Sequence, residues 1–207
     1  TYRVALNWQK AKEEVPLTTL RHELTHMMIE DVAKPTLAKP VPAWLNEGSA
    51  TLEEFTVART KHLEVRHRYS AASMVATRTA LTVADLTDQD AWNARSGDVF
   101  SGQYREASQL VRLLREDIGV ASVTRILEVM GGGQIFEQAY TTVTGKAFSA
   151  FAANALTRLQ AIAPFYPGIA TADDEPGGVP GLSYVLYGFT PNSTVRSTGR
   201  RGCPRSQ

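Results

Sequence analysis

The sequence predicts a mainly α-helical fold with little sheet, and three observations support this. Apolar residues recur at intervals of three and four over most of the first 160 or so positions, as on helices with one buried face. Prolines and glycines interrupt this pattern in only a few short stretches. Strand-like alternation is confined to the two ends of the chain. With 43% hydrophobic and 21% charged residues among 207, the chain can bury the core of one domain and carry an appendage.

The N-terminal stretch combines a short strand with a strongly patterned helix. Residues 2–7 alternate in a way that is compatible with one strand at the edge of a sheet. Pro16 suits the first turn of a helix, which we expect to run to about Glu30. The apolar side of this helix consists of Leu17, Leu20, Leu24, Met27 and Met28.

A proline-rich loop separates this helix from the next. Pro35, Pro40 and Pro42 each disfavour helical backbone in the residue before them. The helical pattern then resumes from Ala43 to about Lys61. The sequence therefore predicts two neighbouring helices joined by a turn, which can lie antiparallel.

The rest of the first 164 residues continues as helices and connections. One helix is expected over residues 63–81, and the stretch LTDQDAWNARSGD after it is typical of a loop. Further helix faces begin at Tyr104, Val120 and Phe148, and the glycines at 131–133 end the second of these. Residues 1–164 are thus expected to form one mainly α-helical domain.

The composition changes abruptly after Pro164. Residues 165–181 are rich in proline and glycine and show no period, as expected of a linker. Residues 182–207 begin with LSYVLYGFTPNSTVRSTG, whose alternation around TPNS predicts a short β segment. These residues resemble the opening of an immunoglobulin-like repeat of bacterial surface proteins. The resemblance implies an extracellular or cell-envelope location.

The overall charge and the cysteine content exclude several classes of function. Lysine and arginine number 22 and aspartate and glutamate 21, so no strong field favours nucleic acid. No apolar run approaches the roughly 20 residues of a membrane span. The single cysteine, Cys203, excludes an internal disulfide and a cysteine-based metal site. Because the chain begins on Thr1, we expect a piece of a longer or processed protein.

The first helix carries the motif with the clearest chemistry. His22, Glu23, Leu24, Thr25 and His26 spell H-E-x-x-H. Residues four apart differ by roughly 40° around a helix and about 6 Å along it, so both imidazoles project from one face. That spacing can chelate one Zn²⁺, which also requires a third protein ligand and an open position for catalysis. Glu23 lies at a rotation from which it can act on the attacking water as the general base.

The strongest candidate for the third ligand is Glu47, in the stretch PAWLNEGSATLEEF of the second helix. Two antiparallel helices would bring it to the histidines. Glu54 lies two turns further along the same face and could accept the distal N–H of a ligand histidine. Glu53 is an alternative partner for the histidine, but it is rotated by about 240° from Glu47 and lies on another side of the helix.

These motifs resemble those of the gluzincin metallopeptidases, in which H-E-x-x-H is followed on the next helix by W-L-x-E-G-x-A. The stretch AWLNEGSA matches the second motif in full. The resemblance covers about residues 17–161 and implies the helical part of an α+β, thermolysin-like zincin fold with most of its N-terminal sheet missing. It implies that zinc is held by His22, His26 and Glu47, and that Glu23 is the base and proton shuttle.

The resemblance also implies a later tyrosine that stabilises the oxyanion, and Tyr104 in GQYREASQLVRLL fits it in position. The expected activity is hydrolysis of a peptide or protein substrate. The chain shows no "GAMEN"-type strand and no acidic pair that anchors a free amine, so the sequence does not distinguish exopeptidase from endopeptidase action.

Three simpler interpretations compete with the enzyme. His22 and His26 could be core histidines, with Glu47 a carboxylate favoured by the dipole at the start of a helix. Tyr104 could be a core tyrosine at the start of an amphipathic helix. The domain could be a decayed, non-catalytic copy of a metallopeptidase that serves as a surface or binding module.

The other two histidines, His62 and His67, lie five apart, about 140° around a helix. They are expected on a solvated face rather than in a ligand set.

Overall fold

A computed structural model describes residues 15–56 and 61–162 of the chain. The expected strand at 2–7, the linker at 165–181 and the β segment at 182–207 lie outside the described residues. The described part consists of helices with no regular strand, in agreement with the predicted mainly α class. The helices are α1 Val15–Ala33, α2 Ala43–Glu54, α3 Lys61–Ala76, α4 Gln89–Ala94, α5 Gly97–Ile118, α6 Val120–Gly131, α7 Phe136–Thr144 and α8 Phe148–Ile162.

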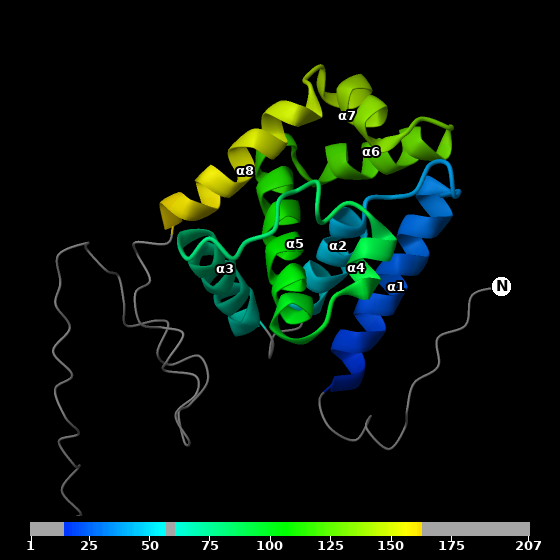
Figure 1. Cartoon of the computed structure of the whole chain (residues 1–207). Coiled ribbons are helices and arrows are strands. Elements are labelled where there is room, and N and C mark those ends of the chain that lie inside the picture. The colour runs from blue at the N-terminus through cyan, green and yellow to red at the C-terminus, as the bar shows by residue number, and fades with distance from the viewer. Residues whose placement is uncertain (1–14, 57–60, 163–207) are drawn as a thin grey trace, which may run out of the picture.

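The long helix α5 lies at the centre of the described domain (Figure 1). It packs most extensively against α2, with α3 on another side, and α1 covers α2. Helices α6 and α7 pack together at one end, and α8 returns from there to contact α3. Helix α5 can occupy this position because Ala107, Leu110, Val111 and Leu114 form a continuous buried stripe along it.

Three predicted elements differ from the structure. The second helix, expected to run to about Lys61, ends at Glu54 as α2. The stretch expected to be a loop before Tyr104 contains the short helix α4, which begins where the Asp88 carboxylate accepts the backbone N–H of Ala91. Helix α5 begins at Gly97, seven residues before Tyr104, so this tyrosine lies inside the helix rather than at its start. Helix α4 was not expected because the cap at Asp88 is a local signal that hydrophobic spacing does not register.

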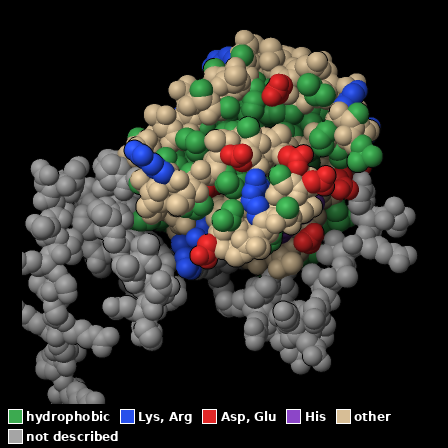
Figure 2. Space-filling model, viewed as in Figure 1, with side chains coloured by type: hydrophobic (Ala, Val, Ile, Leu, Met, Phe, Trp, Pro, Cys, Tyr) green, Lys and Arg blue, Asp and Glu red, His purple; other side chains and the backbone are tan. Residues whose placement is uncertain are grey.

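The apolar side expected for the first helix is only partly buried. Helix α1 buries Ile29 and Ala33, on the face that also carries the two histidines. Leu17, Leu24 and Met28 remain 63%, 42% and 69% exposed. On the face shown in Figure 2, acidic and basic side chains are interspersed with hydrophobic ones, consistent with the near-neutral composition. Among the described residues, no helix has the length and apolarity needed to cross a bilayer.

Helices α2 and α5 approach each other closely at Gly48. A Cβ atom added at this residue would lie 2.4 Å from the carbonyl oxygen of Ala107, a contact that backbone atoms cannot avoid without moving a helix. Gly48 directly follows Glu47, so the close approach also determines how far α2 stands from α5. The cost of a glycine inside a helix is therefore offset by this packing.

We expect Gly48→Ala to lower the free energy of unfolding by about 1–3 kcal/mol, the usual cost of overpacking, despite the better helix propensity of alanine. Urea denaturation followed by circular dichroism measures this change. Gly102→Ala is the matched control, because a Cβ there meets only the end of the flexible Met74 side chain, its methyl carbon and its sulfur. An equal effect of both substitutions would contradict the proposed helix contact.

Candidate metal centre

The candidate metal centre lies between α1, which carries His22 and His26, and α2, which carries Glu47. The chain reverses after α1 at Lys34, whose φ of 46° is in the left-handed region, and then passes through the proline-rich loop. Helix α2 begins beside a distant loop. The backbone N–H groups of Ala43 and Trp44 donate to the carbonyl oxygens of Thr87 and Leu86. These bonds satisfy two of the donors that a helix N-terminus leaves free.

Trp44 fixes the same end of α2 from inside the core. Its side chain is fully buried and stacks on Phe148 with ring centroids 5.9 Å apart. Phe136 contacts it edge-on at 5.6 Å. Because tryptophan supplies a large apolar area, this packing determines the orientation of the helix that presents Glu47 three residues later.

The side chains of His22, His26 and Glu47 meet at one point. Their donor atoms all lie within 4.8 Å of one another. Oε2 of Glu47 is 3.4 Å from Nε2 of His22 and 3.5 Å from Nε2 of His26. These distances are long for hydrogen bonds. They match the separation of about 3.3 Å expected between two atoms that share a tetrahedral zinc ion at about 2.0–2.1 Å.

The other nitrogen of each imidazole has a partner of its own. Nδ1 of His22 lies 2.6 Å from Oε1 of Glu54, and Nδ1 of His26 lies 2.9 Å from Oδ1 of Asn46. Both partners are oxygen acceptors, so each Nδ1 carries the proton and donates it. When Nε2 loses its own proton, its lone pair is directed toward Glu47, the arrangement found around ligand histidines in metal sites.

The three side chains also perturb one another's ionisation. Burial lowers the pKa of His22, but hydrogen bonding and the negative charges of Glu47 and Glu54 outweigh it and raise that pKa to about 9. The pKa of His26 is raised in the same way against the effect of burial, chiefly by Glu47 and Asn46. Burial raises the pKa of Glu47, yet the two histidines lower it to about 2. The metal-free centre therefore holds protons where a cation would bind.

The centre is expected to release protons when it binds zinc. At pH 7 we expect zinc binding to release at least about one proton, because His22 must lose its proton before Nε2 can bind a metal. Above pH 9 the release falls toward zero and the apparent affinity levels off. Because the pKa of His22 is higher in the folded chain than in the unfolded chain, protonated His22 stabilises the metal-free fold. This contribution is complete below about pH 6.5 and is lost as the pH rises through 9. Titration calorimetry in two buffers with different ionisation enthalpies measures the release, and equal heats in both buffers at pH 7 would contradict it.

A cavity of about 350 Å³ adjoins His22 of the centre. Its lining includes His22, Glu23, Glu54 and Tyr104. Glu23 is exposed, unlike the three members of the metal centre, so its carboxylate is accessible from the cavity. Three residues with roles predicted from the sequence therefore line one cavity. They are Glu23, the predicted base, Tyr104, the predicted oxyanion donor, and Glu54, the predicted partner of a histidine.

Tyr104 is positioned by an aromatic cluster. Its ring lies 6.4 Å from that of His22, 5.0 Å from that of Trp92 and 5.3 Å from that of Phe100. Trp92 belongs to α4, and its carbonyl accepts a hydrogen bond from the buried Gln103 of α5. Burial and the carboxylates of Glu47, Glu54 and Glu23 raise the pKa of Tyr104, so its hydroxyl keeps its proton at neutral pH and can donate it.

Two residues of this region were not assigned from the sequence. Asn46 contacts His26. Its position directly before Glu47 was the one feature of the sequence that could have indicated this contact. His67 also lines the cavity, so its predicted place on a solvated face is wrong. Its ring packs edge-on against Phe55 at 4.8 Å, and burial together with Arg105 and Arg66 lowers its pKa to about 4. His67 is therefore neutral at physiological pH.

A scan against protein-family models, a search of curated proteins and a search of solved structures each find no match to this chain. The function is therefore inferred from the sequence motifs and the geometry described above.

Proposed function

We propose that this chain is a zinc-dependent metallopeptidase of the gluzincin type. The observation that carries the proposal is the convergence of His22, His26 and Glu47, whose oxygen-to-nitrogen separations of 3.4 and 3.5 Å suit one tetrahedral ion. Three protein ligands leave a fourth position for water or substrate, as in catalytic rather than structural zinc sites. A zinc ion held by these three residues would supply Lewis-acid chemistry for activating water and polarising a carbonyl group.

The residues of the chain contribute the remaining steps. Glu23 accepts the proton of the attacking water and passes it to the leaving amine, since it lines the cavity one residue from His22. Tyr104 donates its phenolic proton in a hydrogen bond to the oxyanion that forms at the substrate carbonyl. Glu54 and Asn46 hold the two imidazoles in the tautomer that binds metal.

The direct test combines metal analysis with a cleavage assay. We expect the purified chain to contain about one zinc per molecule and to cleave casein or an unblocked peptide library, with loss of cleavage on chelation and recovery on adding zinc. Zinc at this stoichiometry without cleavage of either substrate would contradict the enzyme and support a non-catalytic zinc-binding module. Absence of zinc binding would contradict the metal centre itself.

The role of Tyr104 gives a further prediction. We expect Tyr104→Phe to retain zinc and to lower kcat by roughly 10²-fold or more, as when one oxyanion donor is removed. Tyr140→Phe is the matched control, because Tyr140 is buried in α7 and packs against Phe136, away from the cavity. Steady-state kinetics of both variants decide the matter, and an unchanged kcat for Tyr104→Phe would assign this residue to packing.

A further inference from the structure

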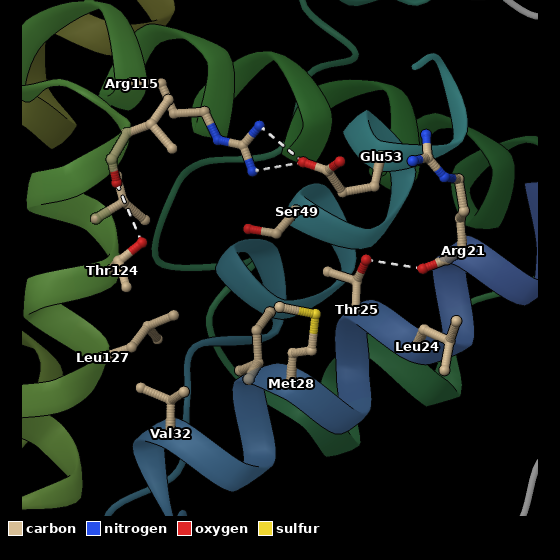
Figure 3. Close-up of a pocket in the computed structure, with 13 residues that line it drawn as sticks. Arg21, Leu24, Thr25, Met28, Val32, Ser49, Glu53, Arg115, Thr124 and Leu127 are labelled. Carbon is tan, nitrogen blue, oxygen red and sulfur yellow. Dashed lines mark hydrogen bonds and ion pairs between the residues drawn. The ribbon is translucent and has the colours of Figure 1, made fainter. Parts of the chain in front are cut away.

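A second cavity lies on another side of the α1–α2 pair. It is a groove of about 440 Å³ between α1, α2, α6 and the C-terminal end of α5 (Figure 3). This volume is within the range of about 300–1,000 Å³ that is usual for small-molecule sites. Its walls are mainly apolar, with Leu24, Met28, Val32, Val120, Val123 and Leu127.

Helix geometry separates this groove from the metal centre. Ser49, at the base of the groove, follows Glu47 by two residues and is rotated from it by about 200°. Thr25 lines the groove, whereas its neighbour His26 faces Glu47. A molecule in the groove would therefore contact none of the three proposed zinc ligands.

One end of the groove is polar, and two of its groups lack partners. Ser49 is only 4% exposed, and its hydroxyl makes no hydrogen bond with any residue that the structure describes. Figure 3 shows this hydroxyl directed into the space between Arg115 and Met28. Nε of Arg115 is likewise buried without a hydrogen-bond partner in the described chain. The Ser49 hydroxyl opens onto the groove, so a ligand oxygen placed there can accept its hydrogen bond.

The charged side chains at this end of the groove indicate the sign of the charge on its ligand. Both terminal nitrogens of Arg115 donate to Oε1 of Glu53 at 3.2 Å, which neutralises one guanidinium. Arg21 also lines the groove, so two positive groups face one carboxylate. The excess positive charge favours an anionic head group, and guanidinium groups suit carboxylates in particular.

We propose that this groove binds a linear carboxylate with a medium-length acyl chain. The chain lies along the apolar walls of α1 and α6, where each buried methylene contributes to affinity. The carboxylate lies at the polar end, where it accepts a hydrogen bond from the Ser49 hydroxyl and lies near the positive charges of Arg115 and Arg21. This site is independent of the peptidase activity proposed above.

Titration calorimetry of the full chain with dodecanoate, kept below its micelle concentration, tests the proposal. We expect saturable binding of one molecule, weakened about tenfold or more by Arg115→Gln and abolished by Thr124→Trp, which fills the groove from the exposed surface of α6. Arg125→Gln and Thr141→Trp are matched controls at exposed sites outside the groove and should leave binding unchanged. Glu47→Ala should also leave it unchanged, which separates this test from that of the metal centre.

Three outcomes would overturn the proposal. The first is an absence of saturable binding by the folded wild-type chain. The second is equal binding of dodecanol and dodecanoate, together with no effect of Arg115→Lys or Arg115→Gln, because the groove would then not select a carboxylate. The third is self-association of the chain in sedimentation that Thr124→Trp abolishes, because a second copy would then be the occupant. Circular dichroism of each variant establishes that it is folded.

Discussion

Replacing His26 with alanine is expected to weaken zinc binding by on the order of 10²- to 10³-fold. Structural zinc sites with four ligands bind with about 10–16 kcal/mol in all, or roughly 3 kcal/mol for each ligand. Each 1.4 kcal/mol corresponds to a factor of about ten in affinity. The Nε2 atom of His26 is one of three donor atoms within 4.8 Å of one another, so its loss leaves an incomplete set. Competition with a chromophoric chelator measures the change.

Two further variants make this experiment specific. Asn46→Ala removes only the acceptor of His26 and should weaken zinc binding by about 10- to 100-fold, less than loss of the ligand itself. Glu53→Gln alters a carboxylate on the same helix that pairs with Arg115 instead, and it should leave zinc affinity unchanged. If His26→Ala bound zinc as tightly as the wild type, the proposed ligand set would be wrong.

Replacing Glu23 with glutamine is expected to retain zinc and to lower turnover by about 10²- to 10⁴-fold, the usual contribution of a general base. The amide has nearly the same shape as the carboxylate but cannot accept a proton. Because Glu23 is exposed in the cavity and is not among the three donors, the metal content should not change. Turnover is measured with saturating substrate and zinc content by elemental analysis of the same sample.

The control for this prediction is Glu30→Gln. Glu30 lies on the same helix, two turns beyond Glu23, and is exposed. It does not line the cavity beside His22, so its substitution should affect neither turnover nor zinc. An unchanged turnover of Glu23→Gln would remove this residue from the role of base, and a loss of zinc would make it a ligand.

The sequence predicted that His22, His26 and Glu47 would lie together, because helical periodicity determines which residues share a face. The spacing of His22 and His26 places their rings together on any regular helix, and the position of Glu47 required only that the next helix return alongside. Glu54, two turns beyond Glu47, contacts His22 as proposed. Asn46 was missed because a single amide next to Glu47 gives no periodic signal.

Other features depend on tertiary packing that a single helix pattern does not contain. The angle between His62 and His67 does not show which side of α3 is buried. The side of α3 that carries His67 faces the core, because the His67 ring packs against Phe55 at the end of α2. Likewise, the apolar spacing on α1 correctly predicted a helix but not that Met28 would be left exposed at the groove.

The hydrogen bonds from the start of α2 to Leu86 and Thr87 have a consequence for how the centre is assembled during biosynthesis. All three donor residues have been synthesised by Glu47, yet the carbonyl groups that anchor their second helix emerge only some forty residues later. A nascent helical hairpin ending near Phe55 would thus contain the complete donor set without the support that fixes its geometry. Acquisition of metal is therefore expected to follow folding of the domain rather than to initiate it.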